Sequence, residues 1–190
     1  VCPVLVLHPI SSAWTRFNKL DLGSIYCFND SLETVVNTLG DCQVGYHLGD
    51  EQLMEKYGSV NGNRLTVGRK SYTAVVLPEL VSIESPTLAL LDAFMRNGGN
   101  VIAAGTLPKY VDGRENAEAL EYLSSHAVKA EGAEALCAAL EKSGAVLQKL
   151  TGDRGRVRVM RRDRDDGTLL YIVNTDNERG RTFTLTSGAK

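Results

Sequence analysis

The stretch Tyr72–Gly105, YTAVVLPELVSIESPTLALLDAFMRNGGNVIAAG, decides the fold of this 190-residue chain. Apolar runs at its two ends predict buried strands over residues 72–77 and 100–105, and the segment between them predicts a helix over 87–96. The apolar positions of that helix recur at helical spacing: Leu88, Leu91, Phe94 and Met95. Two strands joined through a helix are expected to lie parallel, with a right-handed crossover.

Strands and helices alternate on both sides of this unit, which is typical of a parallel sheet flanked by helices. The other strands expected in the sheet cover residues 3–10 and 43–47. Helices are expected over residues 32–39, 50–56, 115–125 and 131–142, and residues 11–30 are expected to be mostly loop. The Asn61-Gly62 turn signal between apolar residues predicts a β-hairpin or an extended excursion from the α/β core. The sequence therefore predicts an α/β domain over residues 1–144.

The pattern changes after Gly144, because strands follow one another without helices between them. These strands are expected over residues 145–150, 156–161, 168–174 and 181–186. Three or four strands make a thin sheet with a face left to cover. We therefore expect a short all-β segment over 145–190, which either packs on the first domain or begins a β-sandwich whose remainder is missing.

Composition excludes several classes of function. With 43% hydrophobic residues and a net charge of -2, the chain has no electrostatic signature of nucleic-acid binding. It has no apolar run of the ~20 residues that span a bilayer, and no visible signal peptide. It begins Val-Cys-Pro, the pattern expected of a trimmed fragment. The four cysteines are expected to be unpaired thiols, although their spacing leaves a disulfide open: Cys2, Cys27, Cys42 and Cys137.

Polar residues follow the first two expected strands, and such residues gather at one edge of a parallel sheet. The candidate ligand or interface contacts at this edge are His8, Ser12, Trp14, His47, Asp50 and Glu51. Trp14 suits stacking on a sugar or anchoring a partner, and also suits plugging the end of the core. The two acids are adjacent, so their side chains diverge and do not face each other across a substrate.

The same edge lacks a complete catalytic set. No Ser or Cys stands between glycines at a strand–helix turn, as a nucleophile elbow requires. No glycine-rich loop follows a strand, so no nucleotide cofactor is expected, and no cysteine pair or histidine has zinc-ligand spacing. We therefore assign no catalytic residue, no metal and no cofactor from the sequence.

Four motifs, in this order, resemble a domain of large bacterial glycoside hydrolases. They are VLVLHPISSAW (4–14), HLGDEQLM (47–54), NGNRLTVGRKSYTAVVLPEL (61–80) and LLDAFMRNGGNVIAAGTLP (90–108). The likeness is to α-L-rhamnosidase-like and family 2-related enzymes and to the β-galactosidase trimerisation domain. It implies a class I glutamine amidotransferase-like, flavodoxin-like fold over residues 3–113. The tail DGTLLYIVNTDNERGRTFTL (166–185) is similar to the opening strands of the β-sandwich that often follows.

The resemblance implies a non-catalytic module whose parent enzyme is bacterial, either cytoplasmic or exported. Its implied partners are other domains of the parent, a second copy in a homo-oligomer, and carbohydrate; nucleic acid and membrane are not expected. Amidotransferases use a cysteine at a strand–helix elbow, and no cysteine here matches that position. Two alternatives stay open: a free-standing amidotransferase-like hydrolase with a Cys-His site, and a small-ligand or protein-binding module without a hydrolase parent.

Overall fold

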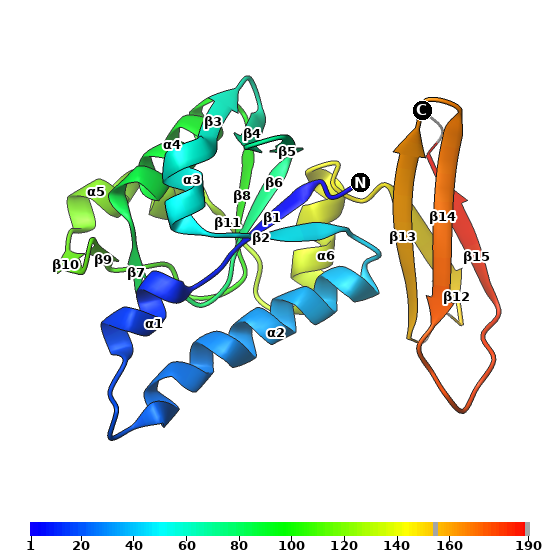
Figure 1. Cartoon of the computed structure of the whole chain (residues 1–190), viewed down its shortest axis with the longest axis horizontal. Coiled ribbons are helices and arrows are strands. Elements are labelled where there is room, and N and C mark those ends of the chain that lie inside the picture. The colour runs from blue at the N-terminus through cyan, green and yellow to red at the C-terminus, as the bar shows by residue number, and fades with distance from the viewer. Residues whose placement is uncertain (154–155, 189–190) are drawn as a thin grey trace.

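The computed structural model describes residues 1–153 and 156–188 as an α/β part followed by antiparallel strands (Figure 1). The centre of the α/β part is a five-stranded sheet in the order β11-β8-β6-β1-β2, with every neighbouring pair parallel. Its strands are β1 (Val4–Leu7), β2 (Tyr46–Gly49), β6 (Ala74–Leu77), β8 (Asn100–Ala103) and β11 (Val128–Lys129). In chain order this is the 2-1-3-4-5 arrangement of flavodoxin-like sheets, which confirms the predicted fold class.

Helices cover both faces of the sheet, as the alternation of side chains along β1 requires. Leu5 and Leu7 point into one hydrophobic cluster with residues of α3, α4 and α5, whereas Val4 and Val6 point into another with residues of α2 and α6. The helices are α1 (Ile10–Arg16), α2 (Tyr26–Asp41), α3 (Glu51–Tyr57), α4 (Ser85–Arg96), α5 (Ala117–His126) and α6 (Ala133–Lys142), with a 3-10 turn η1 (Leu22–Ile25). Within the described residues, no helix has the length and apolar character needed to cross a membrane.

Two small sheets extend from the core. The predicted hairpin is confirmed as a three-stranded antiparallel sheet, and its residues Leu65 and Tyr72 are buried in the same cluster as Leu5. Its strands are β3 (Gly58–Asn61), β4 (Arg64–Val67) and β5 (Lys70–Tyr72). The second sheet consists of β7 (Ser82–Ile83), β9 (Tyr110–Val111) and β10 (Arg114–Glu115). The parallel core is therefore extended by local hairpins and does not stand alone.

The region after β1 is more helical than the sequence predicts. Residues 11–30, expected as mostly loop, contain α1, η1 and the start of α2. The second helix, predicted over residues 32–39, continues to Asp41, and the side chain of Arg158 packs over Gly40, where a Cβ would lie 2.8 Å from its Nε. The chain then turns at Gln43, which has a φ of 61°. The strand expected over 43–47 consequently begins at Tyr46.

The expectation that all four cysteines are unpaired is wrong. Cys42 and Cys137 form a disulfide with their Cα atoms 6.0 Å apart, and it joins the end of α2 to α6. Cys2 and Cys27 are free. The sequence gives little signal for this pair because 95 positions separate the two residues. They meet only because α2 and α6 cover the same face of the sheet.

The C-terminal strands form two antiparallel pairs that pack together (Figure 1). They are β12 (Gln148–Gly152), β13 (Val157–Arg164), β14 (Gly167–Asn174) and β15 (Phe183–Ser187). Arg161, only 6% exposed, holds the pairs together from β13. Its guanidinium donates to Asp163 of its own strand and to Leu147 O, Ser187 Oγ and Gly188 O beside the other pair.

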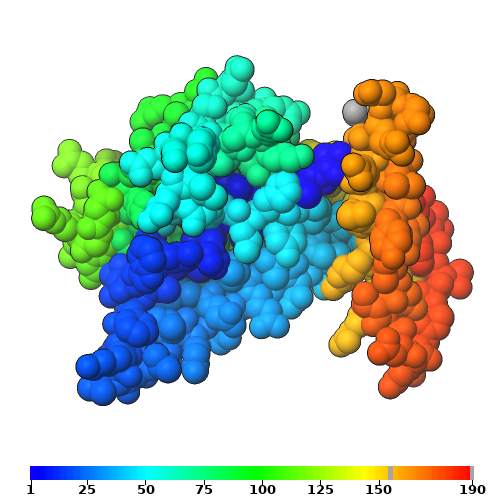
Figure 2. All heavy atoms as spheres, in the orientation of Figure 1, coloured from blue at the N-terminus to red at the C-terminus, as the bar shows by residue number. Residues whose placement is uncertain are grey.

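Two buried glutamines join these strands to the α/β part. Gln43 donates from Nε2 to Val157 O at 2.9 Å, and Gln148 donates from Nε2 to Gln43 O at 2.7 Å. The N-terminal ammonium donates to Arg161 O, and the N-terminal residues lie against β13 (Figure 2). An exposed ion pair between Arg158 and Asp41 adds little energy by itself. The strands therefore pack on the α/β part through specific hydrogen bonds.

Removing the disulfide is expected to lower stability. The disulfide closes a loop between residues separated by 95 positions, which restricts the unfolded chain. Replacing Cys42 and Cys137 together by Ala removes this restriction and is expected to lower the free energy of unfolding by about 2–4 kcal/mol. Urea unfolding of the oxidised protein and of the double variant measures the difference. The matched control replaces the free Cys2 and Cys27 by Ala and is expected to change stability far less. Equal unfolding midpoints for both double variants would show that the cross-link has no stabilising effect.

Candidate functional site

A pocket of about 250 Å³ lies at the C-terminal edge of the sheet, where β1 and β2 end. We call it the edge pocket; it is lined by His8, Ile10, Ser11, Trp14, Asp50, Glu51, Gln52 and Glu84. β1 lies between β2 and β6, so the chain leaves it toward one side of the sheet and later returns on the other. Ligands of open α/β sheets bind beside such a reversal of strand order.

The structure separates the six predicted contacts into two groups. His8, Trp14, Asp50 and Glu51 line the edge pocket together. They come from the residue after β1, from α1, and from the first residues of the α3 region. Ser12 and His47 do not line it.

Ser12 is a fully buried structural residue on α1. Its hydroxyl accepts hydrogen bonds from Val81 N at 2.9 Å and Ser82 N at 3.1 Å, and donates to Ser82 O at 2.8 Å. These bonds fix α1 against β7. Because the hydroxyl is fully used in this way, Ser12 orients the helix that carries Trp14 and does not itself reach a ligand.

His47 is the second residue of β2, which begins three residues later than predicted and continues to Gly49, so His47 does not reach the C-terminal edge of the sheet. It is paired with Leu5 in the parallel register. Its Nδ1 lies 3.1 Å from the hydroxyl of Tyr72, and the two rings meet edge to face. Tyr72 precedes β6, so this contact is made toward the N-terminal ends of the strands and away from the edge pocket.

Glu51 connects three helices at the edge pocket. It is the first residue of α3 and only 6% exposed. One carboxylate oxygen accepts from Ser11 Oγ of α1, and the other accepts from the backbone N–H of Glu84, at the start of α4, at 2.8 Å. Burial raises the pKa of Glu51, against the lowering effect of these hydrogen bonds, and the nearby Asp50 raises it further.

Glu84 is the pocket residue that sequence analysis missed. It is the residue before α4 and its carboxylate lines the pocket beside Glu51. Burial raises the pKa of Glu84, and the negative charges of Glu51, Glu55, Asp112 and Asp50 raise it further. Its position directly before Ser85-Pro86, a helix-start pattern, was the available signal. Because Glu84 and Glu51 are far apart in sequence, the sequence alone did not indicate that they line the same pocket.

The remaining pocket residues combine an aromatic surface with acceptors. Asp50 caps α3, with Oδ1 accepting from Leu53 N at 2.9 Å. Trp14 is 65% exposed, so it does not plug the core. No cysteine lines the pocket, and both oxygens of Glu51 are occupied by hydrogen bonds. The arrangement is suited to hold a ligand or partner and lacks an activated nucleophile.

Two exposed apolar surfaces lie apart from the core. The first, which we call the α1–α2 surface, runs from α1 through η1 to the start of α2, and comprises Trp14, Phe17, Leu20, Leu22 and Tyr26. The second is the outer face of β13–β14, with Met160, Leu169 and Tyr171. Met160 lies directly opposite Tyr171, and Leu169 is two residues along on the same face. Exposed apolar patches mark interaction sites where they are contiguous, as the cross-strand neighbours of β13–β14 are.

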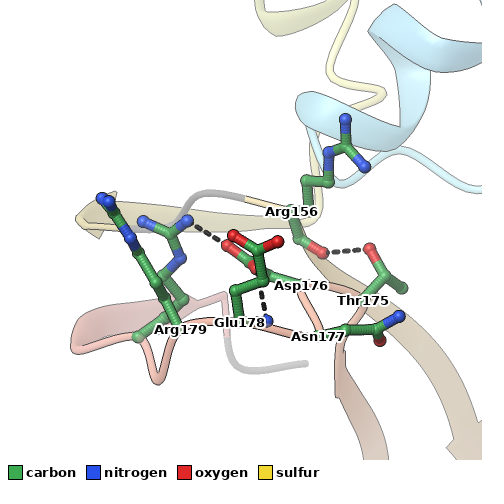
Figure 3. A pocket seen from close by; sticks show the side chains of 7 residues that line it. Arg156, Thr175, Asp176, Asn177, Glu178 and Arg179 are labelled. Atoms are coloured by element: carbon green, nitrogen blue, oxygen red, sulfur yellow. Dashed lines mark hydrogen bonds and ion pairs between the residues drawn. The ribbon is translucent and has the colours of Figure 1, made fainter.

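A larger pocket, of about 480 Å³, lies on the loop between β14 and β15 (Figure 3). It is lined by Arg156, Thr175, Asp176, Asn177, Glu178, Arg179 and Arg181. Part of its charge is satisfied internally, because the Arg181 guanidinium pairs with both Asp176 and Asp153. The backbone N–H of Glu178 also bonds to Asp176, which lowers the pKa of that carboxyl. We interpret these contacts as the internal bracing of a surface loop.

No group of three or more His, Cys, Asp or Glu side chains in residues 1–153 and 156–188 is arranged to hold a metal ion. The edge pocket has carboxylates, but two of its acids are engaged in capping or bridging helices. The chemistry available there is hydrogen bonding and aromatic stacking.

Replacing Ser12 by Ala is expected to destabilise the fold by about 1–3 kcal/mol, because two buried N–H groups lose their acceptor. Chemical denaturation of the purified variant measures this loss. Thr15→Ala, which removes an exposed hydroxyl from the same helix, is the control and is expected to change stability by less than about 0.5 kcal/mol. Equal effects of the two substitutions would contradict the role given to Ser12.

Glu51→Gln is expected to gain stability relative to the wild type as pH rises from about 4 to about 8. A carboxyl whose pKa is raised on folding binds more protons when folded, so its contribution to stability falls as pH rises from its ordinary value of 4.5 through the folded value. Gln can accept from Glu84 N and donate to Ser11 Oγ, which lies 3.2 Å from Ser82 O as an alternative acceptor. Urea unfolding of both proteins across this pH range tests the expectation. A stability difference between variant and wild type that does not change with pH would contradict it.

Comparisons with known proteins connect the chain to one fold. No protein-family model matches the chain, and no curated protein matches its sequence. Among solved structures, it is similar to part of the apo exo-carrageenase GH42 from Bacteroides ovatus, with a TM-score of 0.50 and 12% sequence identity. The alignment covers 97% of this chain and 27% of that chain. The chain thus shares a fold with one segment of a much longer glycoside hydrolase.

Proposed function

We propose that this chain is a non-catalytic accessory domain of a multidomain glycoside hydrolase. The observation that carries the proposal is the extent of the structural match. One alignment to a glycoside hydrolase covers 97% of the chain, and so includes both the α/β part and the antiparallel strands. The same alignment accounts for only 27% of that enzyme. A segment of this size beside a larger catalytic region is the relationship expected of an accessory domain.

The exposed apolar surfaces support a partner within a larger protein. The α1–α2 surface and the outer face of β13–β14 expose large side chains, of which Leu20 is 88% exposed. In this proposal, residues 1–144 form the amidotransferase-like domain and residues 145–190 begin a β-sandwich that the parent completes. The outer face of β13–β14 would then be covered by further parent strands, and the part of the α1–α2 surface from Phe17 to Tyr26 by another domain or a second copy of the chain.

The edge pocket supports the non-catalytic part of the proposal. A free-standing amidotransferase-like hydrolase needs a cysteine beside a histidine at the ends of the strands. His8 lines the edge pocket without a cysteine, and Cys42 and Cys137 are joined in a disulfide. The residues His8, Trp14, Asp50 and Glu51 are therefore proposed as interface or carbohydrate contacts, with Ser12 and His47 serving the fold.

Hydrolysis of a panel of aryl glycosides tests this function. The panel includes α-L-rhamnoside and β-galactoside, and it is applied to the 190-residue chain and to the full-length product of its gene. We expect turnover by the full-length protein alone, because the catalytic carboxylates are proposed to lie outside this chain. The full-length activity would also identify the sugar.

Two results would contradict the proposal in different ways. Turnover by the 190-residue chain would show that it carries its own catalytic site. Alkylation by iodoacetamide would then ask whether Cys2 or Cys27 reacts much faster than an ordinary thiol, with matching loss of activity. No turnover by either protein on any glycoside would remove the hydrolase parent and leave a binding module.

A further inference from the structure

The edge pocket is lined by unused hydrogen-bonding groups and by an aromatic ring. Among the residues that the structure describes, neither the Glu84 carboxylate nor the His8 ring has a hydrogen-bond partner. Asp50 caps its helix with Oδ1 alone, which leaves Oδ2 available. Trp14 lines the same pocket and is 65% exposed. The pocket therefore offers acceptors for hydroxyl groups and a flat apolar surface within one small volume.

The charge of the pocket selects among ligands. Three carboxylates line it, from Asp50, Glu51 and Glu84, and no Lys or Arg does. Glu55 and Asp112 are close enough to raise the pKa of Glu84 as well, after the effect of its burial. A sulfated, phosphorylated or uronic sugar would bring a further negative charge beside these carboxylates without a Lys or Arg to pair with it. Anionic ligands are thus disfavoured at this position.

We infer that the edge pocket binds one uncharged pyranose ring, with an apolar face of the sugar on Trp14 and its hydroxyls donating to Glu84 and Asp50. The inference deepens the proposed function, on which it rests for the choice of carbohydrate as ligand. A volume of about 250 Å³ is just below the range usual for drug-sized ligands, so one ring fits the pocket better than an extended chain. Aromatic stacking and carboxylate acceptors supply the two kinds of contact that a pyranose offers.

Trp14 makes the inference directly measurable, because it is the only tryptophan in the chain. Fluorescence of the 190-residue protein is titrated with galactose, glucose and rhamnose, then with galactose 6-sulfate, galacturonate and galactosamine as charged counterparts. We expect a saturable change with at least one neutral sugar. We expect binding of its sulfated or uronic counterpart to be at least about tenfold weaker. Sulfated sugar binding as tightly as the neutral one would overturn the inference.

Matched variants separate the pocket from the apolar surface around it. Trp14→Ala is expected to weaken neutral sugar binding at least about tenfold by calorimetry. Phe17→Ala removes a similarly exposed aromatic ring that does not line the pocket, and is expected to leave binding unchanged. Equal losses for both would assign the effect to the α1–α2 surface and overturn the inference.

The charge argument has its own variant. Glu84→Gln keeps an acceptor and removes the charge, and the Glu84 side chain makes no capping bond to α4. We expect the variant to raise the affinity for the sulfated sugar, relative to that for the neutral sugar, by at least about threefold. An unchanged preference would contradict selection by charge.

The remaining outcomes distinguish this inference from the proposed function. Absence of binding by every sugar, in fluorescence and calorimetry, would overturn the pocket assignment even if the full-length protein is a glycosidase. Galactosamine binding more than tenfold tighter than galactose would assign the pocket to cations, and would also overturn it. Neutral sugar binding without any glycosidase activity would keep the pocket and remove the hydrolase parent.

Discussion

The buried carboxylate of Glu51 is the interaction on which the edge of the sheet depends. It accepts hydrogen bonds from α1 and from the first backbone N–H at α4, while its own backbone belongs to α3. Desolvating a carboxylate is costly unless its lone pairs are occupied, so these three helices are held in one arrangement. Trp14, Asp50 and Glu84 reach the same pocket because of that arrangement. A charge that sequence analysis assigned to ligand contact thus has a structural task as well.

Elements with a strong local pattern could be predicted from the sequence, and elements fixed by distant contacts could not. The unit over residues 72–105 and the hairpin around Asn61-Gly62 carry their own periodicity and turn chemistry. The region where α2 ends is different, because its side chains contact residues far along the chain: Gln43 bonds to Val157 O and Asp41 pairs with Arg158. The pairing of Cys42 with Cys137 likewise depends on two helices sharing one face of the sheet.

The same distinction applies to the candidate site. His8, Trp14, Asp50 and Glu51 are adjacent in space because they follow two neighbouring parallel strands, a relation that sequence reasoning can use. Ser12 is two residues from Trp14, yet a helix rather than a loop directs it inward. His47 was misplaced by a shift of three residues in the start of β2. Glu84 could not be assigned to the pocket from the sequence, because this requires knowing where the start of α4 lies relative to α3.

The hydrogen bonds between Gln43, Gln148 and the backbone of Val157 have a mechanical consequence. Both amides are buried, so the C-terminal strands resist swinging freely about residues 143–147. The edge pocket and the outer face of β13–β14 therefore keep a set direction and separation relative to each other. A partner bound at one of these two surfaces would therefore be held at a set angle to a partner bound at the other.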